Sequence, residues 1–207
     1  MGRTVSICGA AIAGGKSVRY GEAKSFATVA GERLIDRVLR ALRDASDTQV
    51  IIANDVEAYD TLGLPVRSDV LEDAGAVAGI HAALLYAAEQ GCEGALVLAC
   101  DMPFPSAPLL RALVQHGREM NVDAVLPASD SRRGMEPLCA WYSTRCIVPI
   151  ERAVARDDLR VIAFHDEVRV AIMPPDQVAR FGDPERLFMN VNTREDRDHA
   201  ERLAQAG

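Results

Sequence analysis

The apolar run over residues 94–100 is the feature of this sequence that most restricts the fold. It reads Gly-Ala-Leu-Val-Leu-Ala-Cys, carries no charge, and leads directly into Asp101. A strand that is apolar on both faces is typical of the centre of a parallel sheet, because helices must then cover both faces. The run therefore predicts a three-layer, doubly wound, mostly parallel α/β fold, with Asp101 at the carboxyl end of a central strand.

Other segments have the spacing expected of such a fold. Ser106 is a suitable N-cap for a helix that begins there. Strands are expected at 5–12, 49–53, 66, 123–127, 135–142 and 168–173, and helical segments at 34–42, 56–62, 80–87, 145–154 and 159–164. Along 34–42 the apolar residues occupy one side, and we interpret the arginines on the other side as a solvated face: Arg33, Arg37, Arg40 and Arg43.

A glycine-rich segment follows the first expected strand. Gly14 and Gly15 interrupt the apolar run, and Lys16, Arg19 and Lys24 come soon after them. Glycines let a backbone approach a ligand closely, and the cations indicate that this ligand is an anion. A flexible turn at the carboxyl end of a first strand is how an α/β protein holds a polyphosphate on backbone N–H groups.

Two common phosphate-binding motifs do not fit this segment. The Walker A pattern requires a glycine where the sequence has Ala10, and Gly14, Gly15 and Gly21 lack the spacing of the dinucleotide fingerprint. A generic phosphate loop remains, with a plain strand-to-helix turn as the alternative. In a doubly wound sheet the strand before Asp101 lies beside the first strand, so the segment and Asp101 are expected to face one crevice.

Composition excludes several classes of partner. The chain has 207 residues, a formal charge of −7 and a pI near 5.1, which argues against binding to nucleic acid or to an anionic membrane surface. No apolar stretch approaches the ~20 residues of a membrane span, and no secretory signal pattern is present, so we expect a cytoplasmic protein. The five cysteines and four histidines lack metal-site spacing and are interpreted as structural.

Residues 12–21, followed by Lys24, resemble the L-A-G-G-x-S-x-R-M-G-x-(D)-K signature of the molybdenum cofactor guanylyltransferases, the MobA family of the nucleotidyltransferase superfamily. The resemblance extends over nearly the whole chain. It includes Asp101 in a C-D-x-P segment and an Asn-Val-Asn-Thr segment near the C-terminus. Two departures are Ala76-Val77, where the family has Pro-Leu, and Glu136, where it has Gln or His.

The resemblance implies a set of site residues. Arg19, Lys24 and Asp101 would be catalytic, with Asp101 also binding Mg²⁺, and Asn190 and Asn192 would lie on the acceptor side. The nucleotide would contact Ile12, Ala13, Gly14, Gly15, Lys24, Asn54, Asp69 and Asp101.

The implied reaction transfers GMP from GTP to the terminal phosphate of molybdenum-molybdopterin and releases pyrophosphate. We expect one domain over 1–207, with a nucleotide-binding half at about 1–105 and an acceptor-binding half at about 106–207. A monomer with transient contacts to chaperones of molybdenum enzymes is implied. Two alternatives stay open: a cytidylyltransferase or other small nucleotidyltransferase, and a non-catalytic nucleotide-binding subunit. The glycine at position 14 favours guanylate over cytidylate transfer.

Overall fold

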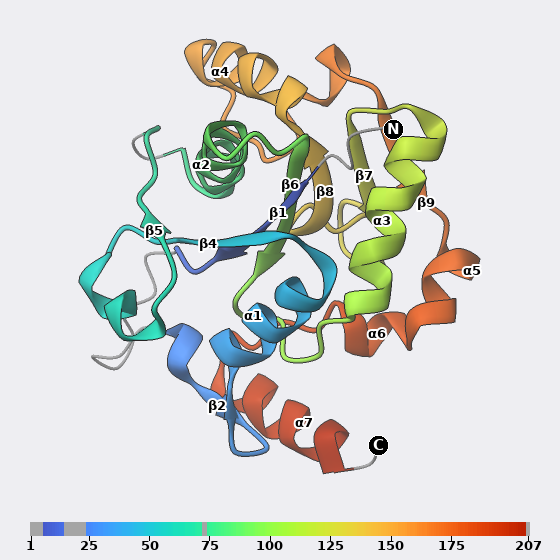
Figure 1. Cartoon of the computed structure of the whole chain (residues 1–207). Helices are drawn as coiled ribbons and strands as arrows, with labels where there is room; N and C mark the ends of the chain where they lie inside the picture. The colour runs from blue at the N-terminus through green and yellow to red at the C-terminus, as the bar shows by residue number, and fades with distance from the viewer. Residues whose placement is uncertain (1–5, 15–23, 72–73, 206–207) are drawn as a thin grey trace.

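The structure is a computed structural model that describes residues 6–14, 24–71 and 74–205 (Figure 1). Its main feature is a seven-stranded sheet with the order β5-β4-β1-β6-β8-β7-β9. The strands are β1 (Ile7–Ile12), β4 (Thr48–Ile52), β5 (Val66–Arg67), β6 (Gly94–Ala99), β7 (Ala124–Pro127), β8 (Cys139–Ser143) and β9 (Val170–Met173).

The sheet is mostly parallel, as predicted. β1 pairs in parallel with both β4 and β6, and only β8 among these seven runs antiparallel to its neighbours. All six residues of β1 and all six of β6 are buried. Strands from both halves of the sequence thus join one sheet, and β6 lies beside β1 as the doubly wound topology requires.

Helices cover both faces of the sheet (Figure 1). α1 (Leu34–Ala45) and α3 (Ala107–Met120) pack together on one face, and α2 (Ala76–Glu89) and α4 (Ile147–Ala155) on the other. Each helix pair closes its own apolar core against the strands. Ser106 caps α3 as expected, because its hydroxyl accepts a hydrogen bond from Leu109 N–H. No helix among the described residues has the length and apolar character needed to cross a bilayer.

A smaller unit lies at the edge where the chain ends. The hairpin of β2 (Thr28–Val29) and β3 (Glu32–Arg33) contacts the terminal helix α7 (Arg194–Gln205). A third apolar cluster joins them, formed by Val29, Leu34, Val191 and Ala200. Two short helices, α5 (Pro175–Val178) and α6 (Pro184–Leu187), precede α7.

Two expected elements differ in the structure. The strand expected at 135–142 begins only at Cys139, because Cys139 N–H bonds back to Glu136 O in a turn that contains Pro137, which has no N–H to donate to a ladder. Residues 161–164 form turns rather than a helix. Val161 and Phe164 are nevertheless buried, so the helix-like spacing of these side chains reflects their burial and not helical backbone.

Candidate functional site

The ends of β1 and β6 meet at the carboxyl edge of the sheet. Cys100 N–H donates to Ile12 O at 3.0 Å, and Ala13 N–H donates to Ile52 O at 2.9 Å. Gly14 follows and is exposed. The start of the glycine segment and Asp101 therefore leave neighbouring strands at one edge, which confirms the adjacency expected from the sequence.

Part of the predicted phosphate site lies outside the described residues. Gly15 and Arg19 fall there, and so does the side chain of Lys24, although its backbone begins the 3-10 helix Lys24–Phe26. The roles assigned to these three residues stay predictions. Ile12, Ala13 and Gly14 are described, and they stand where the segment leaves the sheet.

Asp101 is half-buried on the turn that follows β6, and the surrounding chain holds it from two sides. Its backbone oxygen accepts a hydrogen bond from Val191 N–H at 2.8 Å, which brings the Asn-Val-Asn segment to this turn. Arg37 of α1 donates to Pro103 O at 3.4 Å and to Val29 O at 2.6 Å. Arg37 also lies near Glu32, with a 3.5 Å separation between Arg37 Nε and Glu32 Oε2.

The prediction that Arg37 belongs to a solvated face was therefore wrong. Only 14% of its side chain is exposed, because it reaches between the hairpin and the turn that carries Asp101. Sequence periodicity placed it with the other arginines of the helix. What distinguishes it is the pair of backbone carbonyls that the tertiary fold brings within its reach.

Asn54 and Asp69 contact one another at the ends of β4 and β5. Asn54 Nδ2 donates to Asp69 Oδ2 at 3.2 Å, and Asp69 N–H donates to Asn54 Oδ1 at 2.9 Å. Burial raises the pKa of the Asp69 carboxyl above its usual range, and the hydrogen bond from Asn54 opposes this shift. The two predicted nucleoside contacts thus form one hydrogen-bonded unit.

The two asparagines of the Asn-Val-Asn segment have different surroundings. Asn190 is half-buried and donates to Phe188 O at 3.0 Å, whereas Asn192 is exposed and its N–H donates to Asp196 Oδ2 at 2.8 Å. Asp196 N–H in turn donates to Thr193 Oγ1, so Thr193 caps α7 as expected. Asn190 lines a cavity of about 190 Å³, together with Ser129, Asp130, Ser131, Glu136, Pro184, Glu185 and Phe188.

Glu136 brings a second carboxylate towards Asp101. β6 and β8 pair antiparallel with Leu98 opposite Cys139, and Ala99 N–H bonds to Leu138 O at 2.8 Å. The ladder ends near this point, and the turn over residues 136–139 brings Glu136 to the end of β6, near enough for the charge of Asp101 to act on its carboxyl. Burial raises the pKa of the Glu136 carboxyl, and the negative charge of Asp101 raises it further, while Leu138 N–H and Arg133 act in the opposite direction. The sequence signalled this residue only as a departure from the family pattern.

Tyr59 is a residue of this edge that the sequence did not single out. It lies in the 3-10 helix Glu57–Leu62, is 1% exposed, and carries a hydroxyl within hydrogen-bond distance of both Ala13 and Ser25. Nothing in its sequence context distinguishes it from an ordinary core aromatic. Its contacts arise because the 3-10 helix packs beside the end of β1.

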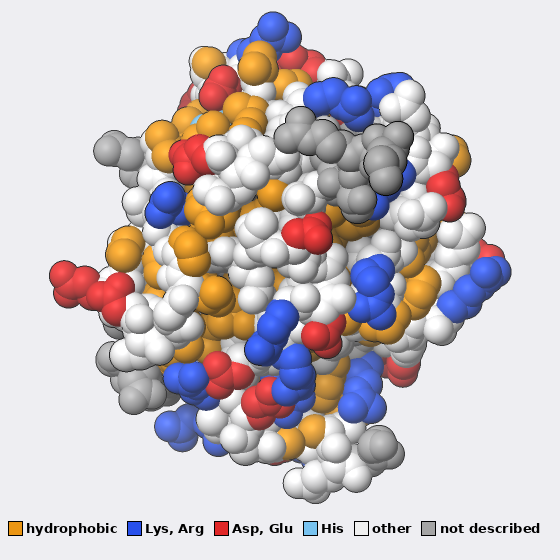
Figure 2. Space-filling view, in the orientation of Figure 1, with side chains coloured by type: hydrophobic (Ala, Val, Ile, Leu, Met, Phe, Trp, Pro, Cys, Tyr) orange, Lys and Arg blue, Asp and Glu red, His pale blue; other side chains and the backbone are white. Residues whose placement is uncertain are grey.

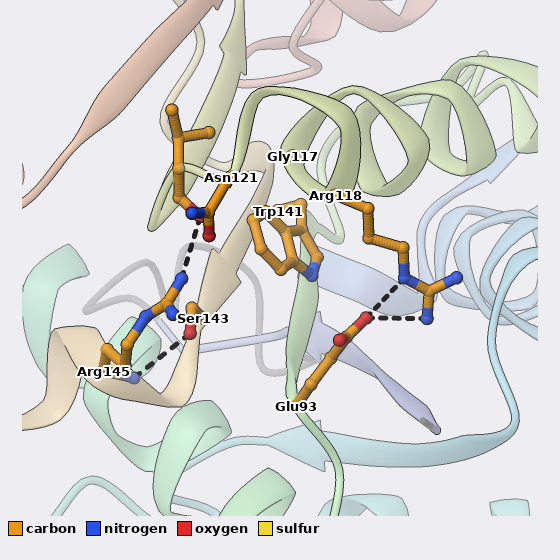
Figure 3. Close-up of a pocket in the computed structure, with 8 residues that line it drawn as sticks. Glu93, Gly117, Arg118, Asn121, Trp141, Ser143 and Arg145 are labelled. Atoms are coloured by element: carbon orange, nitrogen blue, oxygen red, sulfur yellow. Dashed lines mark hydrogen bonds and ion pairs between the residues drawn. The ribbon is translucent and has the colours of Figure 1, made fainter. Parts of the chain in front are cut away.

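A larger cavity, of about 260 Å³, lies at the opposite edge of the sheet (Figure 3). Its wall contains Glu93, which precedes β6, and Ser143, which ends β8. Arg118 Nε donates to Glu93 Oε1 at 2.7 Å, and Arg145 Nη2 donates to Val122 O at 3.1 Å, so both cations of the wall already have acceptors. None of the predicted site residues lines it.

The fold and the carboxyl-edge cluster together are typical of the α/β proteins that bind nucleotides. Asp101 follows the central strand β6, and the glycine segment follows its neighbour β1. The hydrogen-bonded pair of Asn54 and Asp69 follows the next two strands, β4 and β5. In sheets of this kind the ligand lies outside the carboxyl ends of the strands.

Comparison with known proteins gives the family. Residues 9–170 match the MobA-like NTP transferase domain, and the chain belongs to this family of nucleotidyltransferases. It is 34% identical over 204 residues to the molybdenum cofactor guanylyltransferase of Desulfosudis oleivorans, with 98% of each chain covered. It is 36% identical over 189 residues to a probable molybdenum cofactor guanylyltransferase of Pelotomaculum thermopropionicum, covering 91% of this chain and 88% of that one.

A solved structure agrees with these relatives. The molybdopterin-guanine dinucleotide biosynthesis protein A of Archaeoglobus fulgidus superimposes with a TM-score of 0.80 at 27% identity, and the match covers 97% of this chain and all of the other. The three-layer, mostly parallel fold predicted from the sequence is thereby confirmed.

Proposed function

We propose that this enzyme transfers GMP from GTP to the terminal phosphate of molybdenum-molybdopterin. An oxygen of the acceptor phosphate forms a bond to the α-phosphorus of GTP, the bond from that phosphorus to the β-phosphate oxygen breaks, and pyrophosphate leaves with the electron pair. The observation that carries the proposal is the hydrogen bond from Val191 to Asp101, because it joins the acceptor-side segment to the end of β6, next to the nucleotide side.

Catalysis of this reaction requires charge neutralisation and in-line positioning of two anions rather than a protein nucleophile. Backbone N–H groups after Ala13, whose own N–H is bonded to Ile52 O, would hold the triphosphate, and Arg19 and Lys24 would neutralise charge on the α-phosphate and the departing pyrophosphate. Asn190 and Asn192 would contact the acceptor. The adjacency of β1 and β6 supports this division of roles, since the residues assigned to the nucleotide and Asp101 then leave neighbouring strands at one edge.

The carboxylates at the edge suit a divalent cation. Mg²⁺ binds through one or two carboxylates plus substrate phosphates, and Asp101 with the nearby Glu136 offers such a donor set. Asp101 would hold the ion, with Glu136 as the second carboxylate. When bound, the ion neutralises charge on the phosphate oxygens.

Asp69 supports guanine over cytosine as the base. Guanine presents two adjacent N–H donors, N1–H and the 2-amino group, and one carboxylate can accept hydrogen bonds from both. Cytosine presents mainly acceptors at the corresponding edge. Asn54 holds Asp69 through two hydrogen bonds, one donated to its carboxylate and one accepted from its backbone N–H, so this acceptor is fixed before the base arrives.

The cysteines and the surface charges bear on where the enzyme works and with which partners. The five cysteines are all buried free thiols, which supports a reducing, cytoplasmic environment. On the face shown in Figure 2, basic side chains lie among acidic ones, which argues against nucleic acid as a partner for this face. We propose a monomer that contacts molybdenum-enzyme chaperones only transiently.

Pyrophosphate release tests the proposal directly. The purified protein is mixed with Mg²⁺, molybdenum-molybdopterin and each of the four nucleoside triphosphates in turn. We expect pyrophosphate release in the mixture that contains GTP and not in the mixtures that contain the other three nucleoside triphosphates. Release with CTP would favour a cytidylyltransferase, and GTP binding without release under any condition would favour a non-catalytic binding subunit.

A further inference from the structure

Arg37 joins the hairpin of β2 and β3 to the turn that carries Asp101. It lies on α1, and its guanidinium donates one hydrogen bond to Val29 O at 2.6 Å and one to Pro103 O at 3.4 Å. Val29 belongs to β2, and Pro103 comes two residues after Asp101 in the sequence. One side chain thus connects two segments that are far apart along the chain.

The same turn is also held from the C-terminal part of the chain. Val191 N–H donates to Asp101 O at 2.8 Å, and Val191 packs with Val29 in the third apolar cluster. Phe104, which follows the turn, packs against this cluster as well. The hairpin itself contacts α1 through β3 and α7 through β2 (Figure 1). The turn is therefore fixed against one small packed unit.

Burial and charge make the contacts of Arg37 effective. Only 14% of its side chain is exposed, so water competes poorly for its hydrogen bonds. Its charge has a partner in Glu32, because Arg37 Nε lies 3.5 Å from Glu32 Oε2. The planar guanidinium presents its N–H groups in a fixed fork, which lets one side chain bond two carbonyls at a set separation. The point charge of a lysine does not offer this geometry.

We propose that Arg37 is a positioning residue for the cation site, which fixes the turn over residues 101–103 against the hairpin and thereby sets the placement of the Asp101 carboxylate. The inference rests on the proposed function, since it takes Asp101 to hold the divalent cation. Mg²⁺ demands near-ideal octahedral geometry, so a displaced carboxylate binds it less well. Arg37 acts through the turn, because its hydrogen bonds go to backbone carbonyls.

The test compares two substitutions of Arg37 with one of a neighbouring arginine. Arg37→Met keeps an apolar stem and removes every donor, and Arg37→Lys keeps the charge beside Glu32 without the fork. Arg40→Met is the matched control, because Arg40 lies on the same helix and pairs with the same Glu32, while 55% of its side chain is exposed. Mn²⁺ binding is followed by electron paramagnetic resonance, initial rates are measured over a Mg²⁺ series, and urea unfolding of each variant is measured in parallel.

We expect the Mn²⁺ dissociation constant to rise about tenfold in Arg37→Met and in Arg37→Lys, the scale of a lost supporting group at a metal site. The Mg²⁺ concentration for half-maximal rate should rise with it, and saturating Mg²⁺ should restore most of the rate. Added to Asp101→Asn, Arg37→Met should weaken Mn²⁺ binding little further, because it acts through that carboxylate. Arg40→Met should bind Mn²⁺ as the wild type does.

Wild-type Mn²⁺ affinity in Arg37→Met would overturn the inference and leave the proposed function standing. An equal weakening in Arg40→Met would do the same, and so would full additivity with Asp101→Asn. Should Arg37→Met fail to fold, Arg37→Lys decides by the same criteria. Arg37-dependent Mn²⁺ binding in a protein that never transfers GMP would overturn the proposed function alone. A wild type that neither binds Mn²⁺ nor transfers GMP would overturn both.

Discussion

The backbone oxygen of Asp101 accepts a hydrogen bond from Val191 N–H at 2.8 Å. This one contact joins the end of a central strand to a segment near the C-terminus. Val191 is buried in the small cluster with Val29, Leu34 and Ala200, so the hairpin and the terminal helix hold the segment in place. The candidate cation ligand and the candidate acceptor contacts are consequently coupled through packing.

Replacing the carboxylate of Asp101 tests its assignment as the cation ligand. Asp101→Asn keeps the size of the side chain and removes its charge, and we expect GMP transfer to fall roughly 10²-fold, as when one preorganised charge partner is lost. Initial rates over a Mg²⁺ series measure the effect. Asp176→Asn, on an exposed residue of α5, is the control. Equal Mg²⁺ dependence in Asp101→Asn and the wild type would exclude the assignment.

Glu136→Gln tests whether the second carboxylate contributes to the same cation site. We expect the Mg²⁺ concentration for half-maximal rate to rise roughly tenfold, on the scale of lost supporting groups at metal sites, with a smaller loss of rate than in Asp101→Asn. Mn²⁺ binding followed by electron paramagnetic resonance gives a readout independent of turnover. Unchanged Mn²⁺ affinity would show that Glu136 does not act on the ion.

Base selection is expected to depend on Asp69. Asp69→Asn replaces one of two acceptor oxygens with a donor, which mismatches the guanine edge, so kcat/KM for GTP should fall roughly tenfold to a hundredfold. The ratio of the GTP and CTP values is the quantity to measure. Asn54→Ala should have a weaker effect in the same direction, since it loosens Asp69 without removing it. If the ratio of the kcat/KM values for GTP and CTP is the same in Asp69→Asn and the wild type, Asp69 does not contact the base.

Two glycine substitutions separate ligand contact from packing. A Cβ at Gly14 would meet no protein atom closer than Ile52 O at 4.0 Å, so Gly14→Ala should leave the free energy of unfolding within about 0.5 kcal/mol of the wild type. GTP binding should nevertheless weaken, roughly tenfold or more, because the methyl group would occupy space that the phosphates approach.

Gly94→Ala is the opposite case. Its Cβ would lie 2.2 Å from Tyr142 O, a backbone atom of β8, and overpacking of this kind lowers stability by about 1–3 kcal/mol. Chemical denaturation and GTP calorimetry on both variants give the comparison. Wild-type GTP affinity in Gly14→Ala would show that the backbone at Gly14 does not approach the phosphates.

Asp123 should make stability sensitive to acid. Burial alone would raise the pKa of this carboxyl, but Arg169 N–H and the charges of Arg145 and Arg169 outweigh it and lower the pKa below its usual value. A carboxyl with a depressed folded-state pKa stabilises the fold above its unfolded-state pKa, near 3.9, and this contribution is lost as pH falls through the folded-state value.

We therefore expect Asp123→Asn to be less stable than the wild type at pH 7 by about 1–3 kcal/mol. The difference should shrink as the pH falls below about 4, where the wild-type carboxyl takes up its proton. Urea unfolding at a series of pH values measures it. A difference that does not change with pH would attribute the loss to packing rather than to the charge of Asp123.

Much of the fold follows from local pattern. The run over 94–100 determined a central strand because an apolar segment without charge must be covered on both faces, and Ser106 determined the start of α3 because its hydroxyl satisfies a free N–H at a helix end. The place of Asp101 at the carboxyl edge follows from the same run. These features depend on residues that are neighbours in sequence, so pattern alone is sufficient.

Only the tertiary structure decided which distant groups meet. Arg37 and Tyr59 look like ordinary members of a helix face and of a core, yet each reaches polar atoms from remote segments. Glu136 comes near Asp101 because β8 runs antiparallel to β6, so that the turn before β8 lies at the carboxyl end of β6, and the apolar sequence of a strand does not specify its direction. Local sequence specifies backbone conformation and burial, whereas long-range contacts depend on how whole elements pack.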